Sequence, residues 1–433
     1  ETINKIQLDK LNAVLKREKE RQGFYRDLPE RLESLDDLKT LPFTTESDLA
    51  QKGGRMLLCS QGEIQRIISE QTSGTTGAGK RVFYTEGDCE HTIELFMAGL
   101  GEFIYPGSRT MVAMPFSGPS GLGELIADAI RRIGAHPLLT GNNKTYGELK
   151  TILEEERPDT YVGMPTALLS MLRMCGKGSI KRALISGDAC PETVMKAIEK
   201  ILGTPLWPHY GSREMGLGGA ICCQAHEGMH MRENHCITEI IDKEGNVLPD
   251  GQWGELVITT IGMEAQPLIR YRTGDHTRII PGKCICGSEV RRLDFVRRID
   301  QSKSMREMDE LLFQFPELVD YCVRSVGGKK EITALFISDN GEELIRNVCT
   351  EKNIISLENF LGRIDDLLFY CRNHRRYVRR IKHDTKKKKV VSPRQQLGRA
   401  RFRCVVMLYR AIKGTFMREI WRVSPRPDGM TGY

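Results

Sequence analysis

Apolar residues recur at helical spacing near the start of the chain. Between positions 5 and 20 they alternate with charged residues every three or four positions, which predicts an amphipathic helix. The stripe consists of Ile6, Leu8, Leu11, Val14 and Leu15. A turn-rich stretch follows, and its most distinctive segment is Leu41-Pro42-Phe43-Thr44-Thr45.

Short β-rich runs alternate with helical patterns between about residues 60 and 220. The expected strands are 109–114, 160–163 and 182–186, and the expected helices are 123–133, 167–174 and 192–201. This alternation is typical of βαβ units, so we expect an α/β fold with a mostly parallel sheet.

The pattern changes to two-residue alternation from Ile237 onward. The runs 237–241 and 254–260, with turn residues at 244–246 and 274–275, predict an antiparallel sheet or distorted barrel. A smaller α+β unit is expected after Asp300. The resulting organisation is a large N-terminal domain (1–299), a small C-terminal domain (300–393) and a basic amphipathic tail (394–433).

Composition narrows the function classes. The 433 residues are 40% hydrophobic and 28% charged, an ordinary globular balance. No apolar run approaches the roughly 18–20 residues that span a bilayer, so we do not expect the chain to be an integral membrane protein. The polar residues 1–9 lack the apolar core of a secretory signal peptide. Together with thirteen irregularly spaced Cys, this favours a reducing, cytoplasmic location.

The positive charge is concentrated at the C-terminal end. From Arg372 onward there are 19 Lys and Arg against three acids, a balance of +16, whereas the whole chain carries +7. The preceding residues therefore carry −9, and we expect no specific nucleic-acid partner. The basic end could bind an acidic surface (lipid, RNA or the phosphates of a ligand), but a solvated charged face is the simpler interpretation.

A Gly-rich loop carries the sharpest chemical signal. Thr72-Ser73-Gly74-Thr75-Thr76-Gly77-Ala78-Gly79-Lys80 combines hydroxyls, backbone N–H groups and a cation, which suits phosphate oxygens. A Walker A loop would need Ser or Thr after the lysine to hold Mg²⁺, and Arg81 stands there instead. A flexible surface loop is the remaining alternative.

Four further segments follow this loop in order, and together they resemble the adenylate-forming superfamily. They are His209-Tyr210-Gly211-Ser212-Arg213-Glu214, Gly254-Glu255-Leu256, Tyr271-Arg272-Thr273-Gly274-Asp275 and Arg298-Ile299-Asp300. The segments 41–45 and 267–272 make the chain most similar to phenylacetate–CoA ligase-like proteins.

The resemblance implies roles for individual residues. Residues 72–80 would wrap the β- and γ-phosphates of ATP, Glu214 would help hold Mg²⁺, and Asp275 would accept hydrogen bonds from the ribose hydroxyls. Tyr210 would lie beside the adenine. The implied catalytic residues are Lys80, Glu214, Arg298 and Lys388. The implied nucleotide-binding residues are Thr72, Ser73, Gly74, Thr75, Thr76, Gly77, Ser186, Gly187, Asp188, Tyr210, Gly211, Ser212, Asp275 and Arg298.

Three positions depart from the family pattern. Arg213 stands where a Thr or Ser is usual, and Arg297 replaces the Gly before the hinge arginine. The family's C-terminal lysine lies in a Gly-Lys context that the expected window lacks. Its candidates are Lys386 to Lys389, represented above by Lys388.

The resemblance implies an AMP-forming carboxylate–CoA ligase. Its substrates would be ATP, CoA and a small aryl or acyl carboxylate, held near residues 114–122 and 161–169. One alternative is an adenylating enzyme that loads a carrier protein, and another is a degenerate nucleotide-binding homologue without turnover. A homodimer is an open option.

A Cys/His cluster suggests a structural zinc ion. Cys223-x6-His230 and Cys284-x-Cys286 supply four ligands of the type that structural zinc prefers, and phenylacetate–CoA ligase-like proteins often carry a matching pattern. Cys222 or His226 could substitute for one of them. Buried thiols without metal are the alternative.

Overall fold

The computed structural model describes residues 2–70, 80–114, 120–142, 144–188, 190–298, 309–326, 329–337 and 354–359. The chain opens with helix α1 (Ile3–Glu20), which buries Leu11, Val14 and Leu15. The amphipathic helix expected from the sequence is therefore confirmed. Helix α2 (Glu46–Lys52) follows, and the Thr45 hydroxyl caps it by accepting a hydrogen bond from the Asp48 amide.

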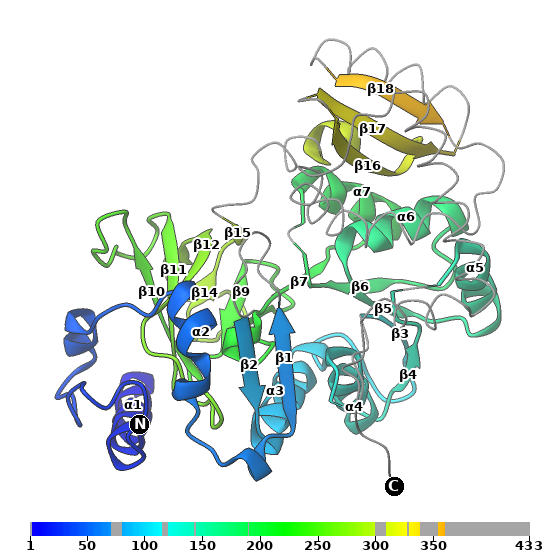
Figure 1. The fold of residues 1–433 in the computed structure, drawn as a ribbon. Helices are drawn as coiled ribbons and strands as arrows, with labels where there is room; N and C mark the ends of the chain where they lie inside the picture. The colour runs from blue at the N-terminus through cyan, green and yellow to red at the C-terminus, as the bar shows by residue number, and fades with distance from the viewer. Residues whose placement is uncertain are drawn as a thin grey trace, which may run out of the picture.

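The largest sheet has nine strands, in the order β13-β14-β9-β8-β7-β6-β5-β3-β4. One half is parallel, as expected, and helices connect its strands (Figure 1). The parallel strands are β3 (Arg109–Ala113), β4 (His136–Leu139), β5 (Thr160–Gly163), β6 (Arg182–Ile185) and β7 (Trp207–Tyr210). The connecting helices are α4 (Leu122–Arg132), α5 (Tyr146–Glu155), α6 (Pro165–Cys175) and α7 (Glu192–Leu202), and α3 (Glu86–Leu100) precedes β3.

The other half of this sheet is antiparallel. Its strands are short: β8 (Ala220–Cys222), β9 (Met229–Met231), β13 (Ile279–Ile280) and β14 (Arg292–Leu293). A separate antiparallel hairpin joins β1 (Arg66–Glu70) to β2 (Lys80–Tyr84). The Gly-rich segment 71–79 connects these two strands and lies outside the described residues.

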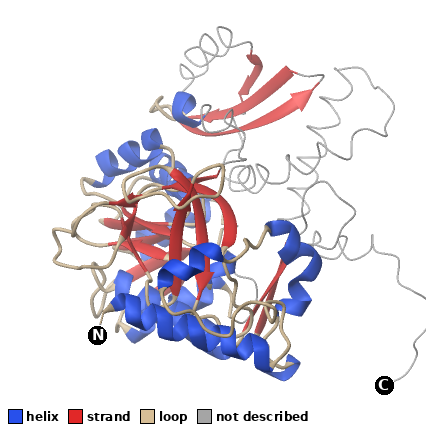
Figure 2. Cartoon of the chain, turned by 90° about the vertical axis from the view of Figure 1, so that its left-hand side faces the viewer, coloured by secondary structure: helices blue, strands red, loops and turns tan. Residues whose placement is uncertain are grey.

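A four-stranded antiparallel sheet follows in the order β10-β11-β12-β15. Its strands are β10 (Cys236–Ile241), β11 (Gly254–Thr260), β12 (Tyr271–Thr277) and β15 (Arg297–Arg298). The two-residue alternation in the sequence therefore predicted antiparallel structure correctly. Figure 2 shows helices packed around the strands of this N-terminal part.

The segment after residue 308 packs on helices α6 and α7. Strands β16 (Leu318–Val326), β17 (Lys329–Phe336) and β18 (Ile354–Asn359) form a three-stranded sheet, at the top in Figures 1 and 2. Phe313 and Val319 share a buried cluster with Leu169 of α6 and Ile198 of α7. The Ser170 hydroxyl also donates a hydrogen bond of 2.8 Å to the Val319 carbonyl. The expected boundary residues 299 and 300 lie outside the described part of the chain.

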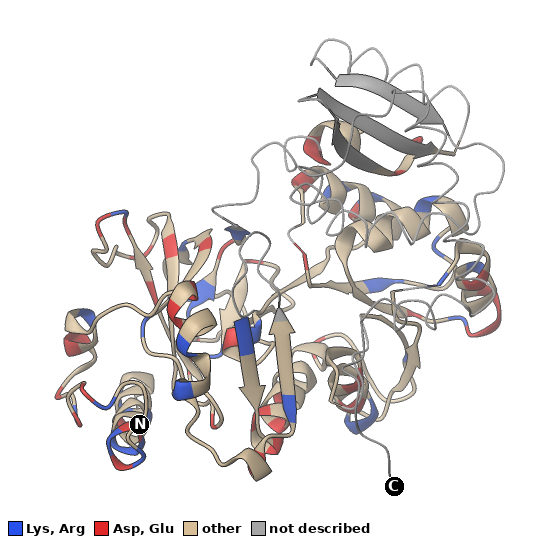
Figure 3. Cartoon of the chain, viewed as in Figure 1, with Lys and Arg blue, Asp and Glu red and all other residues tan. Residues whose placement is uncertain are grey.

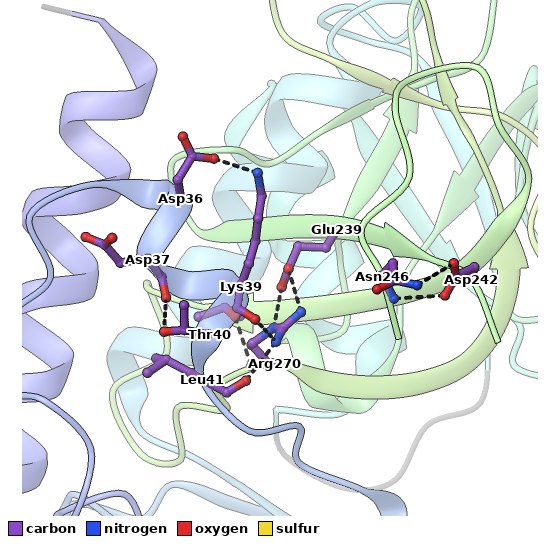
Figure 4. Close-up of polar contacts among 10 residues, drawn as sticks. Asp36, Asp37, Lys39, Thr40, Leu41, Glu239, Asp242, Asn246 and Arg270 are labelled. Carbon is purple, nitrogen blue, oxygen red and sulfur yellow. Dashed lines mark hydrogen bonds and ion pairs between the residues drawn. The ribbon is translucent and has the colours of Figure 1, made fainter. Parts of the chain in front are cut away.

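Arg270 fixes the 41–45 segment to the antiparallel sheet (Figure 4). Its guanidinium makes two hydrogen bonds to the Glu239 carboxylate, at 3.0 and 2.9 Å, and donates to the Leu41 carbonyl at 2.7 Å. The guanidinium also lies 4.1 Å from the centre of the Phe43 ring. Arg270 has a φ of +46°, an uncommon value for a residue with a side chain, and these contacts hold it there.

None of the helices in the described ranges combines the length and apolar character needed to cross a membrane.

Candidate active site

A buried ion pair joins the two catalytic residues expected in the phosphate region. Lys80 begins strand β2, and Glu214 lies in a short 3-10 turn that follows β7. Lys80 Nζ lies 2.6 Å from Glu214 Oε1, and both side chains are almost fully buried. The fold therefore brings together two residues that are 134 positions apart in the sequence.

The environment of Glu214 favours its ionised form. Burial opposes ionisation, but the charge of Lys80 and several hydrogen bonds outweigh it, so the pKa of Glu214 is held below its ordinary value. The Tyr271 hydroxyl donates to Glu214 Oε1 at 3.3 Å. Glu214 is therefore an anionic oxygen ligand of the kind that suits Mg²⁺.

A second carboxylate approaches Lys80 from helix α2. Glu46 Oε1 lies 3.3 Å from Lys80 Nζ, and its side chain is 58% exposed. Glu46 was not among the site residues expected from the motifs. Its only sequence signal is the helix start after Thr45, which places an acidic residue in the first helical turn.

Tyr210 and Asp275 are also brought together. Tyr210 is the last residue of β7 in the nine-stranded sheet, and Asp275 lies on β12 of the four-stranded sheet. The Tyr210 hydroxyl nevertheless donates a hydrogen bond of 2.7 Å to Asp275 Oδ2. Asp275 is buried, and its own amide donates to the Thr273 hydroxyl oxygen. The residues expected beside the adenine and the ribose are therefore direct neighbours.

Two positions of the expected nucleotide site require glycine because of the local backbone. A Cβ on Gly211 would lie 2.3 Å from the Leu217 carbonyl oxygen, so the chain passes too closely for any side chain. Gly187 has a φ of +83°, in the region that favours glycine. It lies with Ser186 and Asp188 directly after β6, at the carboxyl end of a parallel strand. Ligands of α/β sheets commonly bind at such ends.

Ser186 has a partner, His209, that the sequence motifs did not predict. Its hydroxyl lies 2.7 Å from Nδ1 of His209, which precedes Tyr210 on β7. Burial lowers the pKa of His209 to about 4, so the ring is neutral near pH 7. The pair ties the segment after β6 to β7, and thus fixes the two segments expected on either side of the adenine.

Not every expected site residue belongs to the described part of the chain. Thr72, Ser73, Gly74, Thr75, Thr76 and Gly77 lie outside the described residues, as do Lys388 and the 115–119 part of the expected acyl pocket. Arg298 lies on β15, where its backbone is opposite Asp275 of β12. Ser212 lies directly before the turn that carries Glu214.

Four Cys and His side chains converge at the far end of the nine-stranded sheet. The four residues are Cys223, His230, Cys284 and Cys286. Their potential ligand atoms all lie within 4.8 Å of one another. The Cys223 and Cys284 sulfurs are 3.8 Å apart, and Cys286 Sγ is 3.4 Å from His230 Nε2. Thiolates bound to one tetrahedral zinc at 2.3 Å would be separated by about 3.8 Å, so these residues fit the ion.

A hydrogen bond orients the histidine of this cluster. His230 Nδ1 lies 3.1 Å from the Val290 carbonyl oxygen, so Nδ1 carries the proton and donates. Its Nε2 atom is then free of a proton and directed at the cysteines. Cys222 and His226, the two substitutes considered from the sequence, are not in the converging group. His226 Nδ1 instead bonds the Leu206 carbonyl.

Comparison with known proteins places the chain in a family. Residues 71–264 match the family model described as AMP-binding enzyme. The phenylacetate–coenzyme A ligase of Aromatoleum evansii is 30% identical over 300 residues, which cover 64% of this chain and 67% of that protein. The chain belongs to the phenylacetate–CoA ligase family of adenylate-forming enzymes.

Other members of this family match over a longer range. The phenylacetate–coenzyme A ligase of Thermus thermophilus is 26% identical over 390 residues, 81% of this chain and 86% of that protein. Among solved structures, a 2-hydroxyisobutyryl-CoA ligase in complex with an acyl-AMP superposes with a TM-score of 0.69. The superposition covers 87% of this chain and 92% of the ligase chain, at 18% sequence identity. The two proteins therefore share the fold. The resemblance inferred from the sequence motifs is confirmed.

Proposed function

We propose that the protein is an AMP-forming carboxylate–CoA ligase. A carboxylate oxygen attacks the α-phosphorus of ATP, which forms an acyl-adenylate and releases pyrophosphate. The CoA thiol then attacks the acyl carbon and AMP leaves. The observation that carries the proposal is the convergence of Lys80 with Glu214, and of Tyr210 with Asp275. These residues come from the start of β2, the end of β7 with the turn after it, and the interior of β12.

Different residues of the chain have different roles in the first step, the formation of the acyl-adenylate. Lys80, directly after the Gly-rich loop, places a cation at the phosphates and holds it there through its ion pair with Glu214. Asp275 offers two acceptor oxygens to the ribose hydroxyls. Tyr210 provides an aromatic face for the adenine, and its hydrogen bond orients the Asp275 carboxylate.

Glu214 would hold Mg²⁺, which would neutralise charge on the pyrophosphate leaving group. The segment 186–188 would supply backbone groups along the adenine, held by the Ser186–His209 hydrogen bond. Arg298 would reach the ribose, and Lys388 would contact the acyl-phosphate. Residues 300–393 would act as the lid that alternates between the two half-reactions.

The experiment is a panel of aryl and acyl carboxylates with ATP, Mg²⁺ and CoA, in which AMP and ADP are separated by chromatography. We expect acid-dependent AMP and pyrophosphate. ADP as product would overturn the proposal. Product formed only when a carrier protein replaces CoA would favour a carrier-loading enzyme, and ATP binding without turnover would favour a degenerate homologue.

We also propose that Cys223, His230, Cys284 and Cys286 hold a structural zinc ion. Its role would be to tie the loop after β13 to the β8–β9 hairpin. Metal analysis of the purified protein should find about one zinc per chain, which Cys284→Ser should lose together with thermal stability. Cys59→Ser, a cysteine outside the cluster, is the matched control and should retain the metal.

A further inference from the structure

A second cluster of aromatic and cationic side chains lies beside the proposed nucleotide site. Trp253 precedes β11, and its ring stacks on His276 of β12 with centroids 5.6 Å apart and planes 13° apart. The guanidinium carbons of Arg278 and Arg297 lie 5.3 and 5.1 Å from the centre of the same indole. We name Trp253, His276, Arg278 and Arg297 the tryptophan cluster.

The tryptophan cluster carries excess positive charge. Arg278 forms an ion pair of 2.7 Å with Asp294, which balances one of the two guanidinium groups. Arg297 is exposed, and it has no carboxylate within 4.0 Å among the described residues. Two cations against one ring would repel each other, so the arrangement favours an anion that approaches from solvent.

Strand register places the cluster next to the proposed ATP site but on the opposite face of the sheet. Asp275 pairs with Arg298, and the next rung pairs His276 with Arg297. Successive residues of a strand point to opposite faces, so Asp275 and His276 face away from each other. Strand β15 is the edge of its sheet, and Arg297 is therefore at the sheet edge. Figure 3 shows how the basic and acidic positions are distributed along the described chain.

We propose that the tryptophan cluster binds the 3′-phosphoadenosine diphosphate end of CoA. This inference rests on the proposed ligase function. That end of CoA combines three phosphate groups with an adenine ring. Arginine forks match phosphate oxygens, and an indole with nearby guanidinium groups suits a stacked base. Because β15 is an edge strand, the flexible pantetheine arm can pass around it from the cluster to the acyl-adenylate beside Asp275.

The direct test is binding of adenosine 3′,5′-bisphosphate to the full-length protein, by calorimetry and tryptophan fluorescence. We expect binding that quenches fluorescence, and Trp253→Phe should remove most of the quench. Arg297→Gln should weaken binding about tenfold. The matched control is Arg31→Gln, which removes an exposed arginine of the N-terminal region, and it should bind as the wild type does.

Two further measurements separate this site from the ATP site. The bisphosphate should still bind to Asp275→Ala, in which the proposed ribose contact is absent. In turnover, Arg297→Gln should raise KM for CoA about tenfold and reduce the preference for CoA over dephospho-CoA, with a much smaller effect on KM for ATP. A KM for CoA equal to that of the Arg31→Gln control would overturn the proposal.

The failure of this inference can be distinguished from the failure of the ligase function. If no carboxylate supports AMP formation, the ligase proposal fails, yet bisphosphate binding and its dependence on Arg297 remain measurable. If AMP and acyl-CoA form but the bisphosphate does not bind, or binds equally well to Arg297→Gln, the tryptophan cluster is not the CoA site. Binding that is lost in Asp275→Ala would assign the bisphosphate to the ATP site and would also overturn the inference.

Discussion

The Tyr210 hydroxyl donates a hydrogen bond of 2.7 Å to Asp275 Oδ2, and thereby links the last strand of the parallel half-sheet to the antiparallel sheet. The two residues come from different motifs of the family pattern. Their contact means that the proposed adenine and ribose sites share one hydrogen-bonded pair, so a change at either residue should affect nucleotide binding.

Replacement of Asp275 by Ala should weaken ATP binding. It removes both acceptor oxygens from the ribose and leaves the Tyr210 hydroxyl without this partner. We expect a loss of affinity of about 10-fold to 100-fold, since hydrogen bonds to charged groups contribute about 1.5–3 kcal/mol. Equilibrium ATP binding measures it, with the exposed Asp27→Ala as the matched control. Equal affinities in the two variants would contradict the assigned role.

Glu46→Gln should strengthen ATP binding slightly. The Glu46 carboxylate lies 3.3 Å from Lys80 Nζ and adds negative charge where the nucleotide phosphates are expected. Because its side chain is 58% exposed, the effect is screened, and we expect KM for ATP to fall by about twofold at low salt. Steady-state kinetics at two ionic strengths would detect this change. The exposed Glu33→Gln serves as control, and a rise in KM for ATP in Glu46→Gln would show that this carboxylate helps rather than hinders.

The buried carboxyl of Glu18 should make stability depend on pH. Burial raises the pKa of Glu18 to about 7, although its Oε2 accepts a hydrogen bond from the Tyr25 amide. The folded state therefore binds the proton more tightly than the unfolded state, in which the pKa is near 4.5. The free energy of unfolding should fall as pH rises from about 4.5 to 7.

Glu18→Gln should remove this dependence. The variant should match the wild type near pH 4.5 and be more stable by about 3 kcal/mol at pH 8, as urea unfolding can measure. Glu20→Gln, a more exposed residue on the same helix, should show no such divergence. Parallel stability curves for wild type and Glu18→Gln would argue against a protonated carboxyl.

Loss of the Glu239 charge should destabilise the fold strongly. Arg270 and Glu239 are both buried, and the substitution Glu239→Gln leaves a guanidinium in the interior without its counterion. Breaking such a pair typically costs about 3–5 kcal/mol. Glu192→Gln breaks an exposed pair with Lys196 and should change the free energy of unfolding by less than about 0.5 kcal/mol. If the two variants unfold at the same urea concentration, the Arg270 contacts do not hold the 41–45 segment.

The sequence predicted those strands and helices in which the pattern of apolar and polar residues extends over at least four or five positions. The apolar strands 109–113, 160–163 and 182–185 and their connecting helices stand out because each buries nearly every residue or one clear stripe. Strands β13, β14 and β15 have two residues each, too few for any period to appear. They are defined by their partners across the sheet, which no local pattern reveals.

The same limit applies to the site. Motif resemblance singled out Lys80, Glu214, Tyr210 and Asp275 one by one as candidates, but the pairings among them depend on how separate sheets meet. Glu46 belongs to the site through its contact with Lys80, which is 34 positions away in the sequence. His209 belongs to it through its contact with Ser186, which is 23 positions away. The cysteine cluster was easier to predict, because zinc ligands are restricted to a few residue types and the four candidates fall in two short segments.

The packing of Phe313, Leu318 and Val319 against helices α6 and α7 sets a condition on the proposed movement of residues 300–393 as a lid. Phe313, Leu318 and Val319 are fully buried, and burial of each such side chain is worth about 1.5–3 kcal/mol. Rotation of the whole C-terminal part about Asp300 would expose these side chains unless a second apolar surface received them. Strands β16, β17 and β18 belong to one hydrogen-bonded sheet, so they would travel together with these side chains. Release of this sheet from α6 and α7 is then a free-energy cost that the closing motion of the proposed lid has to offset.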